Sequence, residues 1–382
     1  GCPQCKQRAF GSFCESCNAT YDSAELVEPQ CDRCKKPASV RQVKRWFFPL
    51  APYKERLAEY HRQLRLSPKL RKLAAAWLDT DFAPAATQVG TWGIPAGDDQ
   101  IISPWFEVAL AGSYLRERLA ADAKITSCFG YDNAFLYLVQ DPAVCFALER
   151  EAAAPAELAA NEFLLLDDGK MSTSRGNVLD ADDLLARVPA DLLRLYLAKM
   201  RPEDDRSNVN LATAQMFLTM IPRYWQGWLS RLGAALAAET KSRAPQPANA
   251  SLAPWSHEQT QFLSQLDALV ARARRGYDAC SLKEVSIAIH ELVERAVNFG
   301  AGQGHLAGVP KLETERATGL ALELAAARTL AMLVAPVMPS FATRLWNALG
   351  YGGAIPWLDD VMPIAADQPI ALANTQFFTA GG

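Results

Sequence analysis

The chain has 382 residues, half of them hydrophobic, which is enough for two or three domains with sizeable cores. Its formal net charge of −3 argues against a general electrostatic affinity for nucleic acid, so any RNA contact would come from local patches. No uninterrupted apolar run approaches the roughly 20 residues that a membrane span requires. We therefore expect no membrane contact and a cytoplasmic location.

Cysteine pairs separated by two residues dominate the start of the chain. This spacing is typical of a tetrahedral four-thiolate zinc site, and it also fits a reducing compartment. Because four thiolates leave no coordination position open, such a zinc ion would be structural. The predicted ligands are Cys2, Cys5, Cys14 and Cys17.

A third pair of the same spacing, Cys31 and Cys34, makes up only half of a metal site. Either this pair is incidental, or its partner pair lies upstream of Gly1. The chain also begins almost directly with a motif residue, Cys2, and this leads us to expect a start in the middle of a domain.

Residues 1–50 carry a family resemblance. The cysteine pairs, the Ala-Thr-Tyr that ends at Tyr21 and the segment Val40–Leu50 together resemble the zinc-bearing connective insertion of methionyl-tRNA synthetases. In these class I synthetases the insertion divides a Rossmann catalytic domain, whose first half carries the HIGH motif. None of the 4 histidines stands in a His-x-Gly-His context. The resemblance therefore implies that the first half lies before Gly1 or on a separate chain.

The resemblance predicts a fold that combines an α/β part with an all-α part. The predicted domains are a zinc-knuckle insertion (1–50), the second half of the Rossmann catalytic domain (51–205), an α-helical bundle of the anticodon-binding type (206–350) and a C-terminal tail that packs on the surface (351–382).

Residues 51–90 are predicted to be helical, and residues 91–166 should hold the remaining Rossmann strands. One of these, over residues 101–107, corresponds to a family strand whose Trp and Asp face the amino-acid and ribose sites. Here Trp105 is kept, while Glu107 stands where the family has Asp. The resemblance thus assigns both residues to the amino-acid pocket.

A second strand end, Cys128–Asn133, resembles the Phe-Ile-Gly-Lys-Asp motif of the family. Gly130 and Asp132 match it and would bind ATP, whereas Tyr131 replaces the lysine. Ser127 replaces a histidine that helps to form the methionine pocket. Charge-assisted contacts contribute about 1.5–3 kcal/mol each, so these replacements predict that ordinary methionine activation is lost.

A short polar loop follows Phe163–Leu166, which is predicted to be a buried strand. The loop reads Gly-Lys-Met-Ser-Thr-Ser-Arg-Gly-Asn from residue 169 and resembles the KMSKS signature of class I synthetases, which stabilises pyrophosphate. Lysine and hydroxyl groups both contact phosphate oxygens, and α/β folds bind phosphates in such loops. The resemblance implies catalytic roles for Lys170, Ser172, Thr173 and Ser174, and ATP contacts for Lys170 and Met171.

Helices are predicted from Asp180, over residues 191–200 and through the rest of the chain. The family reads its CAU anticodon with an Asn and an Arg on the first bundle helix and with a later Trp. Here Arg231 is kept and the later Trp is missing. Trp228 is a candidate for stacking on a base, with a core position as the alternative. The tRNA-binding candidates are therefore Arg231 and Trp228.

The resemblance as a whole implies a methionyl-type aminoacyl-tRNA ligase, present as a C-terminal portion or a divergent paralogue. Its expected partners are an amino acid, ATP with Mg²⁺ and tRNA, and its expected cofactor is structural zinc. Two alternatives stay open. One is a catalytically incompetent paralogue that binds RNA or protein, and the other is a paralogue that activates a different amino acid in a rebuilt pocket.

Overall fold

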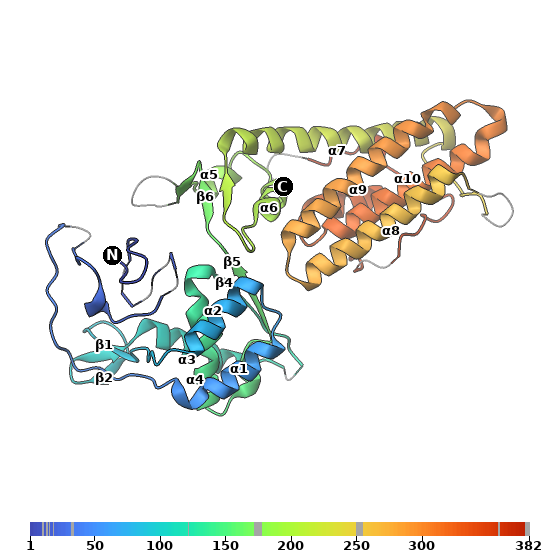
Figure 1. Ribbon diagram of the computed structural model, residues 1–382. Helices are drawn as coiled ribbons and strands as arrows, with labels where there is room; N and C mark the ends of the chain where they lie inside the picture. Colours follow the sequence, from blue (N-terminus) through green and yellow to red (C-terminus); the bar gives the residue numbers. More distant parts are fainter. Residues whose placement is uncertain are drawn as a thin grey trace. The chain divides into compact units, whose positions relative to one another are not determined.

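The computed structural model groups the chain into two compact units (Figure 1). It describes residues 1–382 except 10, 13, 15, 18, 32–33, 121, 172–177, 250–254, 358–359 and 379–382. Unit 1 comprises Gly1–Phe163 and Pro202–Arg206, and unit 2 comprises Leu164–Arg201 and Ser207–Gly382. Residues 164–201, which we placed with the Rossmann half, thus group with the helical unit.

Two helices begin the ordered core of unit 1. They are α1 (Lys54–Gln63) and α2 (Pro68–Leu78). The helix predicted over residues 51–90 is therefore interrupted and ends at Leu78, and residues 87–89 form a strand instead. Proline lacks an N–H and fits only the first turn of a helix, which makes Pro68 a start signal. Ser67 completes the cap by accepting a hydrogen bond from the backbone N–H of Leu70 at 3.3 Å.

The strands of unit 1 form two small sheets. An antiparallel sheet contains, in spatial order, β1 (Thr87–Val89), β3 (Gln100–Ile102) and β2 (Pro95–Gly97). A parallel pair joins β4 (Thr126–Gly130) to β5 (Glu157–Asn161). Helix α4 (Asp141–Ala147) lies between β4 and β5 in the sequence, which makes a β-α-β unit, the building block of Rossmann-type folds.

The strand predicted over residues 101–107 is wrong beyond its first residues. The strand ends at Ile102, and Pro104 begins helix α3 (Pro104–Arg116). The sequence Ser-Pro is a helix start, because proline is favoured at the first helical position. Trp105 and Glu107 therefore lie in the first turn of a helix.

Unit 2 opens with a third small sheet and two helices. Strand β6 (Leu164–Leu166) pairs in parallel with β8 (Ser207–Val209) and antiparallel with β7 (Gly169–Lys170). The predicted strand is confirmed, although only Leu166 of it is buried. The helix predicted from Asp180 is α5 (Ala181–Leu185), and the next is α6 (Ala190–Met200).

The helical bundle predicted after residue 206 is confirmed (Figure 1). Its members are α7 (Leu211–Thr240), α8 (His257–Asp278), α9 (Leu282–Gly302), α10 (Glu313–Val334) and α11 (Pro339–Ala348). Among the described residues, the stretch Pro310–Val334 alone is long and apolar enough to cross a membrane, and 89% of its apolar window is buried within the structure. Helix α10 is thus the central core helix of the bundle.

A charged residue, Glu323, lies within this core helix with 1% of its side chain exposed. Its Oε1 accepts hydrogen bonds from the indole N–H of Trp228, at 2.8 Å, and from the guanidinium of Arg231. Burial raises the pKa of Glu323, and these two donors oppose part of the rise. Gly300 on α9 leaves room for the pair, because a Cβ there would clash with both Arg231 and Glu323.

The prediction that Trp228 stacks on an RNA base is therefore wrong. Only 2% of this residue is exposed, because it packs in the core of the bundle and bonds to Glu323. The alternative of a core tryptophan is the correct one. Arg231 keeps 38% of its side chain exposed, although its guanidinium pairs with Glu323.

The C-terminal tail is largely exposed, and a few of its side chains anchor in the bundle core. Phe377 is fully buried and packs against Phe341. The side chain of Gln226 on α7 accepts from the N–H of Phe377 at 2.9 Å and donates to the carbonyl of Thr375 at 2.9 Å. These contacts attach the tail to the bundle, over whose surface most of its other described residues are exposed.

Replacement of Arg231 by Met should destabilise the bundle, because Glu323 then loses its charged partner inside the core. We expect a loss of about 3 kcal/mol in the free energy of unfolding at neutral pH. The folded-state pKa of Glu323 is raised above its unfolded value, so protonation favours the folded chain. The loss should therefore shrink as the pH falls through that raised value.

Urea unfolding of the full chain, followed by far-UV circular dichroism at neutral and mildly acidic pH, measures both effects. Arg272→Met is the matched control, since Arg272 pairs with the partly exposed Glu284 and Glu291. This control should cost less than about 1 kcal/mol. Equal losses for the two variants would contradict the role given to Glu323.

Candidate functional site

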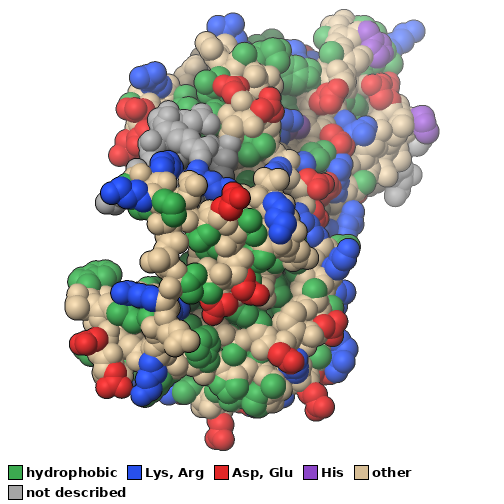
Figure 2. Space-filling view, turned by 60° about the vertical axis from the view of Figure 1, so that its left-hand side comes forward, with side chains coloured by type: hydrophobic (Ala, Val, Ile, Leu, Met, Phe, Trp, Pro, Cys, Tyr) green, Lys and Arg blue, Asp and Glu red, His purple; other side chains and the backbone are tan. Residues whose placement is uncertain are grey.

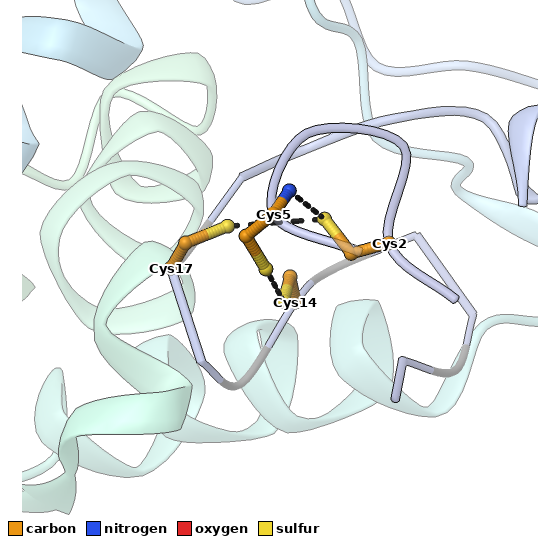
Figure 3. Close-up of side chains that lie close together, drawn as sticks. All are labelled: Cys2, Cys5, Cys14 and Cys17. Atoms are coloured by element: carbon orange, nitrogen blue, oxygen red, sulfur yellow. Dashed lines mark hydrogen bonds between the residues drawn. The ribbon is translucent and has the colours of Figure 1, made fainter. Parts of the chain in front are cut away.

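Four cysteine sulfurs converge at the start of unit 1 (Figure 3). The Sγ atoms of Cys2, Cys5, Cys14 and Cys17 all lie within 4.8 Å of one another. Two of the Sγ–Sγ distances are 3.8 Å (Cys2 to Cys17) and 3.6 Å (Cys5 to Cys14). A tetrahedral ion with bonds of about 2.3 Å to sulfur requires sulfur–sulfur edges of about 3.8 Å. The four sulfurs could therefore hold a metal ion.

The surroundings of these thiols shift their pKa values in opposite directions. Burial by itself raises the pKa of Cys2, but the N–H groups of Cys5 and Gln4 point at its sulfur and bring its pKa down to about 7. Burial and the neighbouring sulfurs raise the pKa of Cys17 to about 12. Four thiolates can share this space only when a cation balances their charge.

The third cysteine pair stands apart from this cluster. Cys31 and Cys34 are exposed, in a turn where the N–H of Lys35 donates to the carbonyl of Cys31 at 2.9 Å. Within the described ranges, no further His, Cys, Asp or Glu completes a metal-binding group around them. The structure therefore adds no ligand to the predicted half site.

A cavity of about 570 Å³ in unit 1 brings together two residues of the predicted catalytic site, Trp105 and Asp132. Trp105 is 49% exposed and approaches from the first turn of α3. The Asp132 carboxylate lies against the backbone of Gly130. A Cβ at Gly130 would lie only 2.6 Å from Asp132 Oδ1, so glycine leaves room for the carboxylate. The buried amide of Gln140 also lines the cavity, and its Nε2 has no hydrogen-bond partner in the described part of the chain. The cavity thus offers an aromatic face, a carboxylate and an unpaired amide to a ligand.

The other two predicted amino-acid pocket residues are elsewhere. Glu107 is exposed on α3 and is not among the residues that line this cavity. Ser127, on β4, lines a separate cavity together with Asp141. Sequence reasoning missed Gln140 and Asp141; the signal available was a pair of polar residues inside an otherwise apolar stretch.

The loop that resembles KMSKS follows strand β7, in unit 2. Lys170 belongs to β7 and pairs with Leu165 of the neighbouring strand β6. The Met171 side chain packs partly buried against the apolar cluster around Leu166 and Tyr196. This packing does not support an ATP contact for the Met171 side chain. Ser172, Thr173 and Ser174 lie outside the described residues.

The visible surface carries no broad field of one charge. Figure 2 shows Lys and Arg interspersed with Asp and Glu over that face. An example from the bundle is Arg272, which pairs with Glu284 and Glu291 at 2.9 Å each. The charge of Arg272 is therefore partly neutralised by these two carboxylates.

Comparisons with known proteins agree with this architecture. The methionine–tRNA ligase of Pyrobaculum aerophilum is 26% identical, over 98% of this chain and 69% of that protein. The enzyme of Pyrobaculum islandicum is 28% identical, over 91% and 64%. The chain thus spans about two thirds of the length of these curated relatives.

A solved structure shows the same fold. Methionyl-tRNA synthetase of Mycobacterium tuberculosis, in complex with methionyl-adenylate, superposes with a TM-score of 0.76 at 18% identity, covering 93% of this chain and 74% of that one. A family model described as tRNA synthetases class I (M) matches residues 1–218, more than half of the chain. The chain belongs to the methionyl family of class I tRNA synthetases.

Proposed function

We propose that this chain is the C-terminal portion of a methionyl-type aminoacyl-tRNA ligase, which acts in the cytoplasm and uses ATP with Mg²⁺ to join an amino acid to tRNA. The observation that carries the proposal is the similarity to methionine–tRNA ligases along 98% of the chain. That similarity includes the cysteine cluster, the β-α-β unit, the loop after β7 and the bundle.

Within this function, the predicted residues have different roles. Lys170 and the hydroxyls of Ser172, Thr173 and Ser174 stabilise the pyrophosphate that leaves during activation, because a cation and hydroxyl donors offset its growing charge. Gly130, Asp132 and Trp105 hold the nucleotide and amino acid. The cavity of about 570 Å³ that Trp105 and Asp132 share supports this assignment. The exposed part of Arg231 remains a candidate contact to tRNA.

The metal in the cysteine cluster is, we propose, zinc in a structural role. Four thiolates form a closed tetrahedral shell, which zinc prefers and which leaves no position for a substrate. The apolar cluster around these cysteines includes Tyr21 and Leu26 but is small. The bound ion would therefore supply much of the stability of this segment.

A second candidate function, a binding module without amino-acid activation, is favoured by one observation. Trp105, Glu107 and Ser127 do not line one common cavity among those described. A separate chain that carries the first Rossmann half is a candidate partner. The parallel sheet has only the strands β4 and β5 in the described residues, whereas parallel sheets are normally larger and covered on both faces.

Purified without chelators, the full chain should contain about one zinc ion, measured by inductively coupled plasma mass spectrometry. Cys14→Ser should lose most of it, because Cys14 belongs to the four-sulfur cluster. Cys34→Ser is the matched control and should retain it, since the exposed Cys34 lies outside that cluster. Metal loss of the same size in both variants, or a metal-free wild type, would contradict the site.

Pyrophosphate exchange into ATP tests the ligase itself. The chain alone should show no methionine-dependent exchange above a blank without methionine, because its predicted pocket residues do not converge. Exchange should appear with some amino acid once the first Rossmann half of the Pyrobaculum aerophilum enzyme is added. Exchange with methionine by the chain alone would contradict the loss of the methionine pocket. No exchange with any of the amino acids in either setting would favour the binding module.

A further inference from the structure

A second cavity in unit 1, of about 250 Å³, lies between helix α3, strand β4 and the turn that leads into α4. Its walls include the apolar side chains of Val108 and Leu136 and the ring of Tyr137. Ser127 lines it as well, and the buried Asp141 closes it from α4. The space therefore combines an apolar wall with a carboxylate.

Only one of the two carboxylate oxygens of Asp141 has a hydrogen-bond partner in the described part of the chain. Its Oδ1 accepts a hydrogen bond from Arg116 Nη2 at 2.6 Å, and the two side chains are only 4% and 14% exposed. Arg116 is itself fixed by donation from Nε to the carbonyl of Ala153 at 2.6 Å. The second carboxylate oxygen, Oδ2, is buried and has no hydrogen-bond partner in the described part of the chain.

The backbone is adapted to this arrangement at two places. A Cβ at Gly112 would lie 2.8 Å from Arg116 Nη1, so glycine makes room for the guanidinium. A π-helical turn, Leu136–Gln140, comes directly before Asp141. Such turns are rare in proteins, and those that occur are frequently found at functional sites. Here the turn precedes the side chain that carries the unpaired oxygen.

An unpaired oxygen on a buried carboxylate is unfavourable for the folded chain. Burial raises the pKa of Asp141, and Arg116 opposes part of that rise. A ligand that donates a hydrogen bond to Oδ2 would remove this unfavourable contribution to the free energy of the folded chain. A thioether cannot, because its sulfur is only a weak acceptor.

We propose that this cavity binds the side chain of an amino acid that ends in a hydrogen-bond donor, with Asp141 as the acceptor and the apolar wall against its aliphatic stem. This inference rests on the proposed function and deepens it, since Ser127 is one of the predicted amino-acid pocket residues. It assigns the chain to a polar amino acid rather than to methionine.

Direct binding to the full chain, without ATP or tRNA, tests the inference by saturation-transfer NMR titration. The probes are L-glutamine and L-lysine, which carry terminal donors, and L-methionine and L-norleucine, which are similar in length and carry none. At least one donor-bearing probe should bind about tenfold more tightly than both apolar probes. Equal or tighter binding of methionine or norleucine would overturn the inference, as would no binding of any probe up to about 10 mM.

Two variants locate the binding. Asp141→Asn should abolish the preference for the donor-bearing probe. Val108→Phe fills the cavity from an exposed position on α3 and should weaken binding of that probe about tenfold, even if the first variant folds poorly. Leu115→Phe, also exposed on α3 but outside the lining, is the control. Binding that survives Val108→Phe unchanged would overturn the assignment of the cavity.

The outcomes separate this inference from the proposed function. Binding of glutamine or lysine with no pyrophosphate exchange would support the site and contradict the ligase. Exchange with methionine in the presence of the added Rossmann half, without any donor preference in binding, would support the ligase and contradict the inference.

Discussion

The buried carboxylate of Glu323 lies where three helices of unit 2 meet. Helix α10 is surrounded by the bundle, and Glu323 within it must be paired because an uncompensated charge in a core is strongly destabilising. Trp228 and Arg231 of α7 provide the donors, and Gly300 of α9 provides the space. These contacts fix how three helices meet. They also bury the Trp228 ring, so the same requirement that stabilises the bundle removes that side chain from RNA recognition.

Unit 1 is organised by polar groups in a comparable way. Four thiols at the chain start lie close enough together to hold a metal ion, and the apolar cluster around them is small. Farther along, two consecutive polar residues line two cavities: Gln140, at the end of the π-helical turn, lines the larger one, and Asp141, at the start of α4, lines the smaller one. Each has a buried atom without a partner in the described residues. The scaffold of the family is thus kept, and two cavities of unit 1 are each lined by one of these buried polar groups.

Local patterns in the sequence were sufficient for the features that depend on near neighbours. The spacing of the cysteines predicted the cluster, Asp180 predicted the start of α5, and helical periodicity predicted the bundle. Features that depend on distant pairs could not be predicted. Periodicity places Trp228 on one face of a helix but does not tell which face the bundle covers. The ion pair of Arg116 with Asp141 arises only when α3 packs against α4, and Pro104, read as part of a strand, begins a helix instead.

The central claim is that Trp228 and Arg231 are engaged in the bundle itself, through their hydrogen bonds to the buried Glu323. The most direct measurement compares the affinity of the full chain for two tRNA transcripts that differ only in the anticodon, one of them CAU, by fluorescence anisotropy at one salt concentration. Because Trp228 is buried and Arg231 is paired with Glu323, the two dissociation constants should agree within about threefold. A preference for CAU of about tenfold or more, equivalent to about 1.4 kcal/mol, would contradict the account.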